Sequence, residues 1–230
     1  MELARTTREK QRAVSPYYAE YCSFKTTDKT SGAHLIGADS LVGDRLKIVF
    51  KPNQDNDMVA WVYNKFDKEV GVFDNRVSRR LQLCQADGWE IHAVLSAVLV
   101  STGEDGGAHY SGEAAVMCFS KRYSEEFNTF LDGVAGKIAE GTRPALSLKA
   151  PAIKNVIESH GQWLPRDNEP KRKLSKGEAV VKDHLKQDEK MIELARKGNP
   201  GCMAVGWGFI ILLVLGAIWL LNSFLHFLPF

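Results

Sequence analysis

Alternating apolar and polar side chains predict a series of β-strands in the first half of the chain. Leu46, Ile48 and Phe50 share one face of the first strand and alternate with mostly charged neighbours, which is the period of a half-buried strand. Residues 58–63 and 69–73 read as the next two strands, and the turn-rich residues between them indicate a meander.

A second pair of strands is predicted further along the chain. Residues 91–100 form an almost continuous apolar run rich in valine, which favours a central strand over a helix, and residues 113–120 supply its partner. The connection 102–108 is glycine-rich and acidic, so it indicates a hairpin and not a phosphate-binding loop. We expect one barrel-like core formed by the inward side chains Leu46, Ile48, Phe50, Val94, Val98 and Val116.

Apolar residues at helical spacing predict helices that flank these strands. Asp74 is placed to cap a helix that ends at Gly88. An amphipathic helix is predicted at 127–138 and a shorter one at 153–157. The fold class is therefore α+β, with one compact domain over residues 32–160.

Three polar segments surround this domain. Residues 1–31 form a polar lead with an aromatic cluster that we expect to pack on the domain, not to stack on a ligand: Tyr17, Tyr18, Tyr21 and Phe24. Residues 161–170 carry two prolines and little apolar character, as in a linker. Residues 171–202 predict a charged helical stalk whose apolar positions approximate a heptad, but Glu178 and Asp188 interrupt it. Self-association through the stalk is allowed, although a solvated helix is preferred.

The C-terminal segment 203–230 has the character of a membrane span. It contains no Lys, Arg, Asp or Glu, so all 30 basic and 28 acidic residues precede it. As a helix, residues 204–221 would extend roughly 27 Å, close to the thickness of the hydrocarbon core of a bilayer. We predict one transmembrane helix, with Trp207 and Trp219 as its anchors in the membrane.

The flanking charges predict how this span is oriented. Positive charges precede it at Lys186, Lys190, Arg196 and Lys197 and none follows it, so the domain is expected in the cytoplasm and the short C-terminus on the far side. The first fourteen residues alternate charges and lack the apolar core of a secretory signal peptide. We therefore expect a single-pass, tail-anchored protein of the lipid bilayer.

The cysteines fit a reducing compartment. Cys22, Cys84, Cys118 and Cys202 show neither a paired metal-binding spacing nor a dense disulfide framework. Cys202 lies beside the predicted span and could be acylated, although an incidental small residue is the preferred reading.

No catalytic motif stands out. The six histidines have neither the spacing of a zinc protease nor a nearby cysteine pair, and no Walker loop, nucleophile elbow or dinucleotide fingerprint occurs. Asp105, His109 and Glu113 could be drawn as an acid–base set, but all three belong to a polar hairpin. We therefore expect a protein that is not an enzyme and needs no cofactor, with an uncharacterised enzyme as a remaining alternative.

The first predicted hairpin resembles the HIRAN domain family. The resemblance covers about residues 37–120 and rests on a Pro-Asn pair at a strand end, a loop Asp, an Ala-x-Val strand and a Val-Gly strand that leads into a helix: Pro52, Asn53, Asp57, Ala60, Val62, Val70 and Gly71. It implies a small β-barrel related to OB folds. In DNA-binding members of the family, the loop Asp and the neighbouring Asn receive the 3′-terminal hydroxyl of single-stranded DNA, while aromatic side chains stack on bases.

This chain departs from the DNA-binding members where bases would stack. Asn56 replaces an aromatic residue before Asp57, and residues 38–40 replace paired tyrosines. Stacking contributes roughly 1–3 kcal/mol per base, and a nearly neutral domain lacks the counterion release that drives nucleic-acid affinity. Pro52, Asn53 and Asp57 also have ordinary structural roles in ending a strand and bonding loop amides.

The candidate ligand-binding residues are therefore Asn53 and Asp57, carried over from the resemblance, together with two arginines of the following helix, Arg76 and Arg80. Arg45, Lys47 and Arg79 could extend these arginines into a basic patch, although a solvated face is preferred. We expect a membrane-bound binding or adaptor module with a protein partner. Binding of a 3′ end of single-stranded DNA is the disfavoured alternative.

Overall fold

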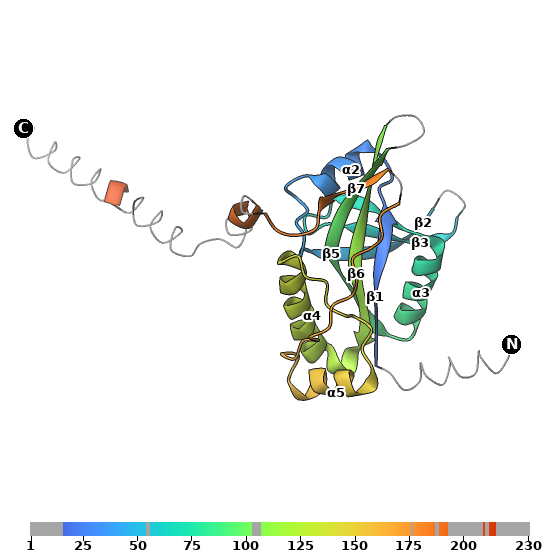
Figure 1. Cartoon of the computed structure of the whole chain (residues 1–230), viewed down its shortest axis with the longest axis vertical. Coiled ribbons are helices and arrows are strands. Elements are labelled where there is room, and N and C mark those ends of the chain that lie inside the picture. Colours follow the sequence, from blue (N-terminus) through green and yellow to red (C-terminus); the bar gives the residue numbers. More distant parts are fainter. Residues whose placement is uncertain are drawn as a thin grey trace, which may run out of the picture. The chain divides into compact units, whose positions relative to one another are not determined.

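The computed structural model describes most of the chain up to residue 192 and a few residues beyond it: 16–53, 56–102, 107–175, 177–186, 189–192, 209 and 212–214. The chain divides into a first unit that ends at Leu185 and a second that begins at Lys186. The first unit contains a closed antiparallel barrel of six strands with helices around it, so the predicted α+β class is confirmed (Figure 1).

The predicted meander is present at one side of the barrel. Strands β2 (Arg45–Pro52), β3 (Met58–Tyr63) and β4 (Glu69–Phe73) pair in sequence order. At Gly71 an added side chain would collide with the main chain of Lys25, which explains why a glycine follows Val70 in β4.

The hairpin β5 (Trp89–Thr102) and β6 (Ala108–Ser120) forms the other side, also as predicted. Strand β1 (Tyr17–Lys25) joins the two halves because it pairs with both β4 and β6. The barrel closes where the first residues of β2 pair with the middle of β5.

Strand β5 is long enough to have two neighbours on one edge. Ala93 and Val94 pair with β2, and the last part of β5 extends past the barrel and pairs with β7 (Glu178–Lys182). The order of the strands is therefore β2-β3-β4-β1-β6-β5-β7, with the additional β2–β5 pairing that closes the ring.

The inner core fills the barrel, and two helices cover it. Helices α2 (Lys29–Ile36) and α3 (Asn75–Ala86) contribute Leu35, Val77, Leu81 and Cys84 to a cluster that also contains the predicted Leu46, Val98 and Val116. Asp74 caps α3 as predicted, because its carboxylate accepts a hydrogen bond of 2.7 Å from the Val77 amide.

One residue of the predicted inner core is wrong. Ile48 and Phe50 pack against the inner core as predicted, although they are only half-buried, whereas Val94 points to the other face of the sheet. Val94 follows the inward Ala93, so its side chain must alternate outward, and an irregular register between Leu95 and Ala97 brings Val98 back inside.

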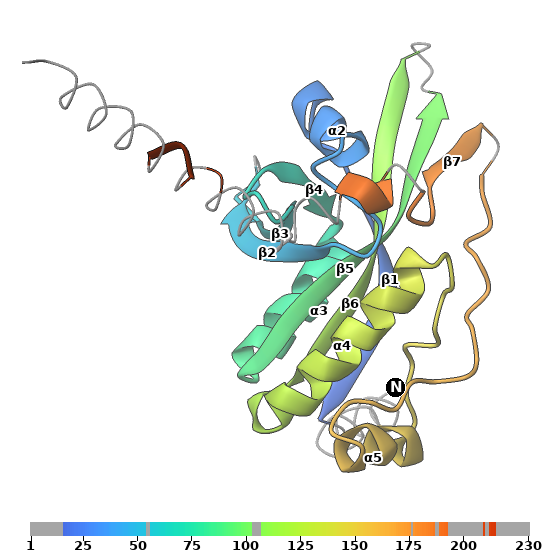
Figure 2. The same ribbon diagram turned by 90° about the vertical axis from the view of Figure 1, so that its left-hand side faces the viewer.

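A second, outer core lies between the barrel wall and two helices. Helices α4 (Ser124–Ala139) and α5 (Ala150–Glu158) match the predicted positions. Helix α4 lies on the outer face of β1, β6 and β5, and α5 packs against α4 at the lower end of the unit (Figure 2). Five apolar residues of α4 are fully buried there: Phe127, Phe130, Leu131, Val134 and Ile138.

The structure differs from the polar lead predicted for residues 1–31. Residues 17–25 are strand β1, buried on both faces, because Cys22 and Phe24 enter the inner core while Tyr17 and Ala19 enter the outer core. The aromatic cluster thus packs within the domain. Residues 29–36 form α2, whose capping box at Asp28 and Ser31 was not recognised in the sequence.

The predicted linker and the beginning of the stalk belong to the folded unit. We call residues 161–185 the strap: Trp163 and Leu164 pack on the outer core, and residues 178–182 form strand β7 instead of a helix. The β-branched pair Val180 and Val181 favours a strand, and Gly177, at φ 85°, makes the turn that precedes it.

The predicted membrane span lies almost entirely outside the described residues, as do both of its tryptophans. In that segment only Phe209 and residues 212–214 are described, and they are helical and exposed. Within the described part of the chain, no helix is long and apolar enough to cross a membrane.

Candidate functional site

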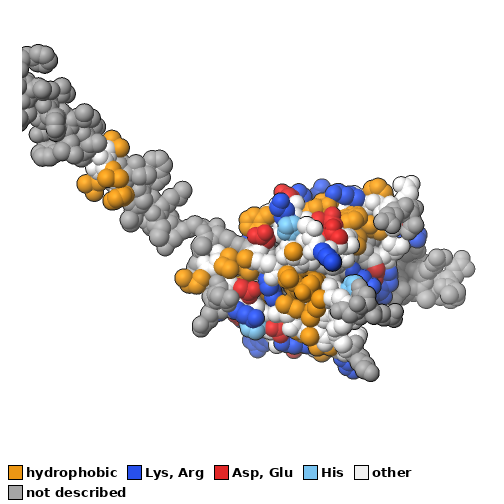
Figure 3. Space-filling model, turned by 90° about the horizontal axis from the view of Figure 1, so that it is seen from above, with side chains coloured by type: hydrophobic (Ala, Val, Ile, Leu, Met, Phe, Trp, Pro, Cys, Tyr) orange, Lys and Arg blue, Asp and Glu red, His pale blue; other side chains and the backbone are white. Residues whose placement is uncertain are grey.

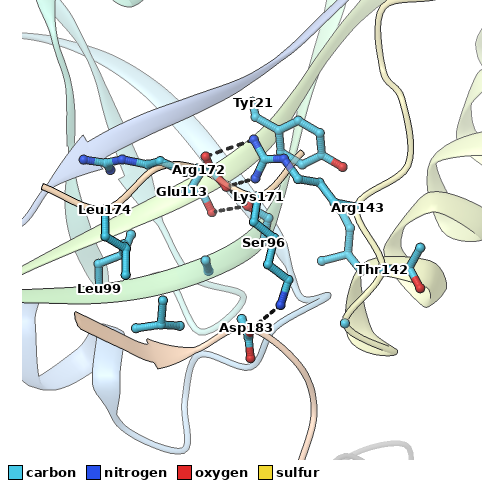
Figure 4. A pocket seen from close by; sticks show the side chains of 14 residues that line it. Tyr21, Ser96, Leu99, Glu113, Thr142, Arg143, Lys171, Arg172, Leu174 and Asp183 are labelled. Atoms are coloured by element: carbon cyan, nitrogen blue, oxygen red, sulfur yellow. Dashed lines mark hydrogen bonds and ion pairs between the residues drawn. The ribbon is translucent and has the colours of Figure 1, made fainter. Parts of the chain in front are cut away.

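A pocket of about 60 Å³ lies between the outer face of the barrel and the strap. Strands β1, β5 and β6 form its floor, the turn after α4 forms one wall, and the strap forms the other (Figure 4). Such a site, mostly apolar with a few convergent polar groups, is the kind of place where proteins bind ligands.

A buried ion pair forms the polar wall. The side chains of Glu113 in β6 and Arg143 after α4 are only 5% and 17% exposed. Arg143 makes two contacts with the carboxylate, one of which joins Nη2 to Oε1 at 3.1 Å, and the Ser96 hydroxyl donates to Oε2 at 3.0 Å. Breaking such a pair leaves a buried charge without compensation, so it fixes the turn firmly to the sheet.

Tyr21 completes this wall from strand β1. The guanidinium carbon of Arg143 lies over the Tyr21 ring, 3.6 Å from the ring centroid. The Tyr21 hydroxyl donates a hydrogen bond of 3.0 Å to the Pro144 carbonyl. Burial raises the pKa of the Tyr21 hydroxyl far above its ordinary value, so Tyr21 stays neutral. Arg143 Nε is buried and has no hydrogen-bond partner among the described residues.

Two further ion pairs join residues within the strap, where it folds back on itself. Lys171 Nζ lies 2.7 Å from the Asp183 carboxylate, and Arg172 Nη2 lies 3.0 Å from that of Glu178. Hydrogen bonds from Lys171 and His184 lower the pKa of Asp183, and a hydrogen bond from the Ser175 amide is the main cause of the lowered pKa of Glu178. Both carboxylates are therefore charged at neutral pH.

The opposite side of the pocket is apolar and open. Leu99 forms its floor, and Leu174 and Val180, each 45% exposed, form its rim. Every acidic or basic group in the pocket already has a partner of opposite charge. The pocket can therefore accept an uncharged apolar group. Separately, no group of three potential metal ligands occurs in the described part of the chain.

The predicted loop residues lie at a different place, at the tip of the β2–β3 hairpin. Asn53 uses its side chain to hold the loop, because Oδ1 accepts a hydrogen bond of 2.8 Å from the Asp57 amide. Asp57 is exposed at the start of β3, and Asn56 has the positive φ of 62° that the tight turn requires. Asn53 thus has the structural role that the sequence predicted, because its side chain bonds a loop amide.

The structure does not bring the two arginines together with this loop. Ser78 and Gln82 lie on the flank of α3 that bonds the β3 backbone. Arg80 lies on the opposite flank, where it bonds Glu20 and the Tyr18 hydroxyl of β1, and Arg76 lies one turn before it. The four predicted residues therefore lie in two separate groups, Asn53 with Asp57 and Arg76 with Arg80.

The aromatic residues of the N-terminal cluster do not lie beside Asp57. Tyr17 stacks on Phe127 in the outer core, and Tyr18 binds Arg80. Trp61 and Tyr63 instead share the outer face of β3 with the facing lysines of β2, as the register shows. Trp61 Nε1 is buried and has no partner among the described residues.

The sequence did not reveal this pocket. Glu113 was considered only together with Asp105 and His109, its partner Arg143 is 30 positions away, and the strap that faces them was predicted as linker and stalk. Comparisons with known proteins add no relatives: no family model matches the chain, and a search of the curated proteins finds no significant match.

Proposed function

We propose that the folded unit is a non-catalytic binding module that recognises a protein partner through the pocket beside the strap. The observation that carries this proposal is the combination of a fully paired polar wall with an exposed apolar rim. Because the Glu113 carboxylate is engaged by Arg143 and Ser96, it is not free to act as a general base. The rim residues Leu174 and Val180 instead offer contact area for an apolar side chain of a partner.

Photo-crosslinking tests this role of the pocket. A photoreactive phenylalanine analogue replaces Leu174 in the full chain expressed in its membranes. Leu83 on α3 is the matched control, because it is equally exposed, at 44%, but lies outside the pocket. We expect a discrete product from position 174 alone, with an added mass that differs from a second copy of this chain.

Two variants extend this test. Leu174→Glu should lose the partner because it places a charge on the apolar rim. Leu83→Glu should retain it. Products of equal intensity from positions 174 and 83 would refute a specific pocket.

We further propose that the barrel is HIRAN-like. Three features support this: β2 ends at Pro52, the loop before Asp57 is pinned by Asn53, and helix α3 follows β4 directly. The closed six-stranded barrel agrees with the architecture that the resemblance implies. The resemblance concerns the scaffold, and the pocket lies outside the matched motif.

The proposed location is the cytoplasmic face of a membrane, with residues 203–230 as a single C-terminal span. The support is the uncharged apolar sequence preceded by a basic segment. The full chain should remain with membranes after a carbonate wash, whereas deletion after Gly201 should release a folded protein. Release of the full chain by carbonate would refute the anchor.

Single-stranded nucleic acid is a second candidate ligand, and the outer face of the meander favours it. Trp61 and Tyr63 could stack on bases, and Lys47 and Lys51 lie on the same face. Both lysines are engaged, however: Lys47 pairs with Asp67 at 2.6 Å, and Lys51 Nζ donates to the Tyr63 hydroxyl at 2.6 Å. The Asp67 carboxylate offsets the charge of Lys47, whereas the Tyr63 hydroxyl holds Lys51 in place without removing its charge.

Fluorescence anisotropy with labelled oligonucleotides separates the two candidates. We expect no preference for a free 3′ end at physiological salt, because Asn56 stands where DNA-binding members have a stacking aromatic residue and the domain is nearly neutral. Micromolar or tighter binding that depends on the 3′ end and is lost in Asp57→Ala would overturn the protein-partner proposal. Trp61→Ala would then show whether the outer face contributes.

A further inference from the structure

Exposure alone does not single out a binding surface on the folded unit. Hydrophobic side chains form patches between charged ones where the unit is seen from above (Figure 3), and scattered apolar groups of this kind are ordinary on protein surfaces. The pocket beside the strap differs because it is hollow and mostly apolar. Its size and the stiffness of its walls therefore say more about an occupant than its exposure does.

The volume of the pocket limits what can enter it. An apolar cavity of about 150 Å³ holds a benzene ring, and a single water molecule needs roughly 10–15 Å³. At about 60 Å³, the pocket lies between these limits. It is therefore large enough for a branched aliphatic group of a few carbon atoms and too small for an aromatic ring.

Aliphatic side chains line the floor and the rim of the pocket. Leu99 and Val180 lie opposite each other in the β5–β7 register, and both line the hollow. Leu99 and Ile138 are only 2% and 1% exposed, whereas Leu174 and Val180 leave the mouth open to a partner. An aliphatic occupant would therefore remove apolar surface from water on both sides of the contact.

The walls of the pocket are fastened, so it cannot widen easily for a larger group. The Leu185 amide donates a hydrogen bond of 2.9 Å to the Ala139 carbonyl, which ties the end of the strap to the end of α4. Lys182 Nζ fastens β7 to the loop after α2. On the opposite wall, the buried pair of Arg143 and Glu113 fixes the turn after α4 to the sheet. Close-packed walls of this kind resist the insertion of extra volume.

We propose that the pocket takes one branched aliphatic side chain of the protein partner, of the size of valine, leucine or isoleucine, and excludes aromatic side chains. The inference rests on the proposed function, because it names the group that the partner presents. The charged groups of the pocket are already paired, as Figure 4 shows for Glu113 with Arg143 and for Lys171 with Asp183, so the occupant carries no charge. The size and stiffness of the walls then select among uncharged groups.

Two small probes that differ only in this group test the inference. They are 3-methylbutanamide, which carries an isopropyl group, and phenylacetamide, which carries a phenyl ring in its place. Each is titrated into the full chain in lipid nanodiscs while NMR follows the methyl resonances of Leu99 and Val180. We expect 3-methylbutanamide to bind at least ~5-fold more tightly, because the ring would overpack the pocket. The exposed methyl groups of Leu83, which lies outside the pocket, should not shift with either probe.

Enlarging the floor of the pocket should remove this preference. Leu99→Ala deletes buried methyl groups from the floor and leaves a larger cavity, so phenylacetamide should bind this variant at least as tightly as 3-methylbutanamide does. A thermal melt shows whether Leu99→Ala is folded. Leu99→Val makes a smaller change in the same direction and should narrow the difference between the two probes.

Tighter binding of phenylacetamide to the parent chain, or no saturable shift with 3-methylbutanamide, would overturn the inference. The photo-crosslink from position 174 reports separately on the proposed function. A discrete crosslink together with a preference for the phenyl ring would leave the partner site in place and refute only the aliphatic occupant. Saturable binding of 3-methylbutanamide without a crosslink would refute the protein partner while supporting the selection for an aliphatic group.

Discussion

At the scale of single residues, the barrel interior leaves no spare volume beside Phe24. Phe24 lies opposite Gly112 across the β1–β6 pair and is 1% exposed. A side-chain carbon added at Gly112 would overlap the Phe24 ring, whereas one added at Gly136 in α4 would have no neighbour within 4 Å. Gly112 is therefore required by the packing of Phe24, whereas no neighbour requires a glycine at position 136. Replacing each glycine by alanine distinguishes the two cases.

We expect Gly112→Ala and Gly136→Ala to change stability in opposite directions. Gly112→Ala should destabilise by about 1–3 kcal/mol through overpacking of the core. Gly136→Ala should stabilise by about 0.5–1 kcal/mol, because alanine loses less backbone entropy in a helix. Urea unfolding of the folded unit measures both. A neutral Gly112→Ala would show that the Phe24 ring can move aside.

The three described cysteines provide a second test at this scale. Burial raises the pKa of the Cys22 thiol to about 12, and Cys84 and Cys118 are also buried. Because the thiolate is the reactive form, all three should resist iodoacetamide at pH 8 in the native state and react after unfolding in guanidinium. Rapid native labelling of Cys22 would contradict its burial in the barrel.

At the scale of elements, the strap is folded back on itself by two internal ion pairs. Ion pairs join Lys171 to Asp183 and Arg172 to Glu178, whereas the helices α4 and α5 are held by the outer core. Gly141 allows the strap to approach the end of α4, because a side chain there would come within 3.1 Å of His184 Cβ. The strap should therefore respond to acid before the barrel does.

We predict that acid opens the fold-back within the strap before the barrel unfolds. The pKa values of Asp183 and Glu178 are lowered in the folded state, so their stabilisation is complete above their ordinary pKa, about 4, and is lost as the pH falls through the lowered values. Hydrogen exchange should show amides 171–183 losing protection below about pH 4. Asp183→Asn should weaken this pH dependence. Simultaneous loss of amide protection in the strap and in the barrel would show that the strap does not open separately.

At the scale of the whole molecule, the folded unit extends to Leu185, beyond the boundary at 160 that the sequence predicted. The added residues complete both the sheet and the outer core, since they include β7, Trp163 and Leu164. Lys182 is only 8% exposed and fastens β7 to the loop after α2. The segment thus acts as part of the domain and not as a spacer.

Two truncations test this boundary. A chain ending at Leu185 should unfold cooperatively, because it keeps both cores intact. A chain ending at His160 should be less stable by about 2 kcal/mol or more, because it exposes the apolar surface under Trp163 and Leu164. Thermal unfolding compares them. Equal melting temperatures of the two chains would show that the domain ends at residue 160, as the sequence predicted.

Local order along the chain was determined by the sequence itself. The meander, the β5–β6 hairpin, the Asp74 cap and the helices α3, α4 and α5 follow from periodicity and capping, which depend on residues a few positions apart. The Asn53 loop bond also follows from a local pattern. These features were therefore predictable without knowledge of the fold.

Only the tertiary structure decided which segments belong to the sheet and where the pocket lies. β1 and β7 are recruited by the free edges of strands distant in sequence, and the barrel closes through the β2–β5 pair. Glu113 meets Arg143, and Lys182 meets Gly37, because folded strands bring them together. The sequence of a short strand such as β1 or β7 does not reveal its partner, since the free energy of pairing comes from an edge and a core that exist only after the chain has folded.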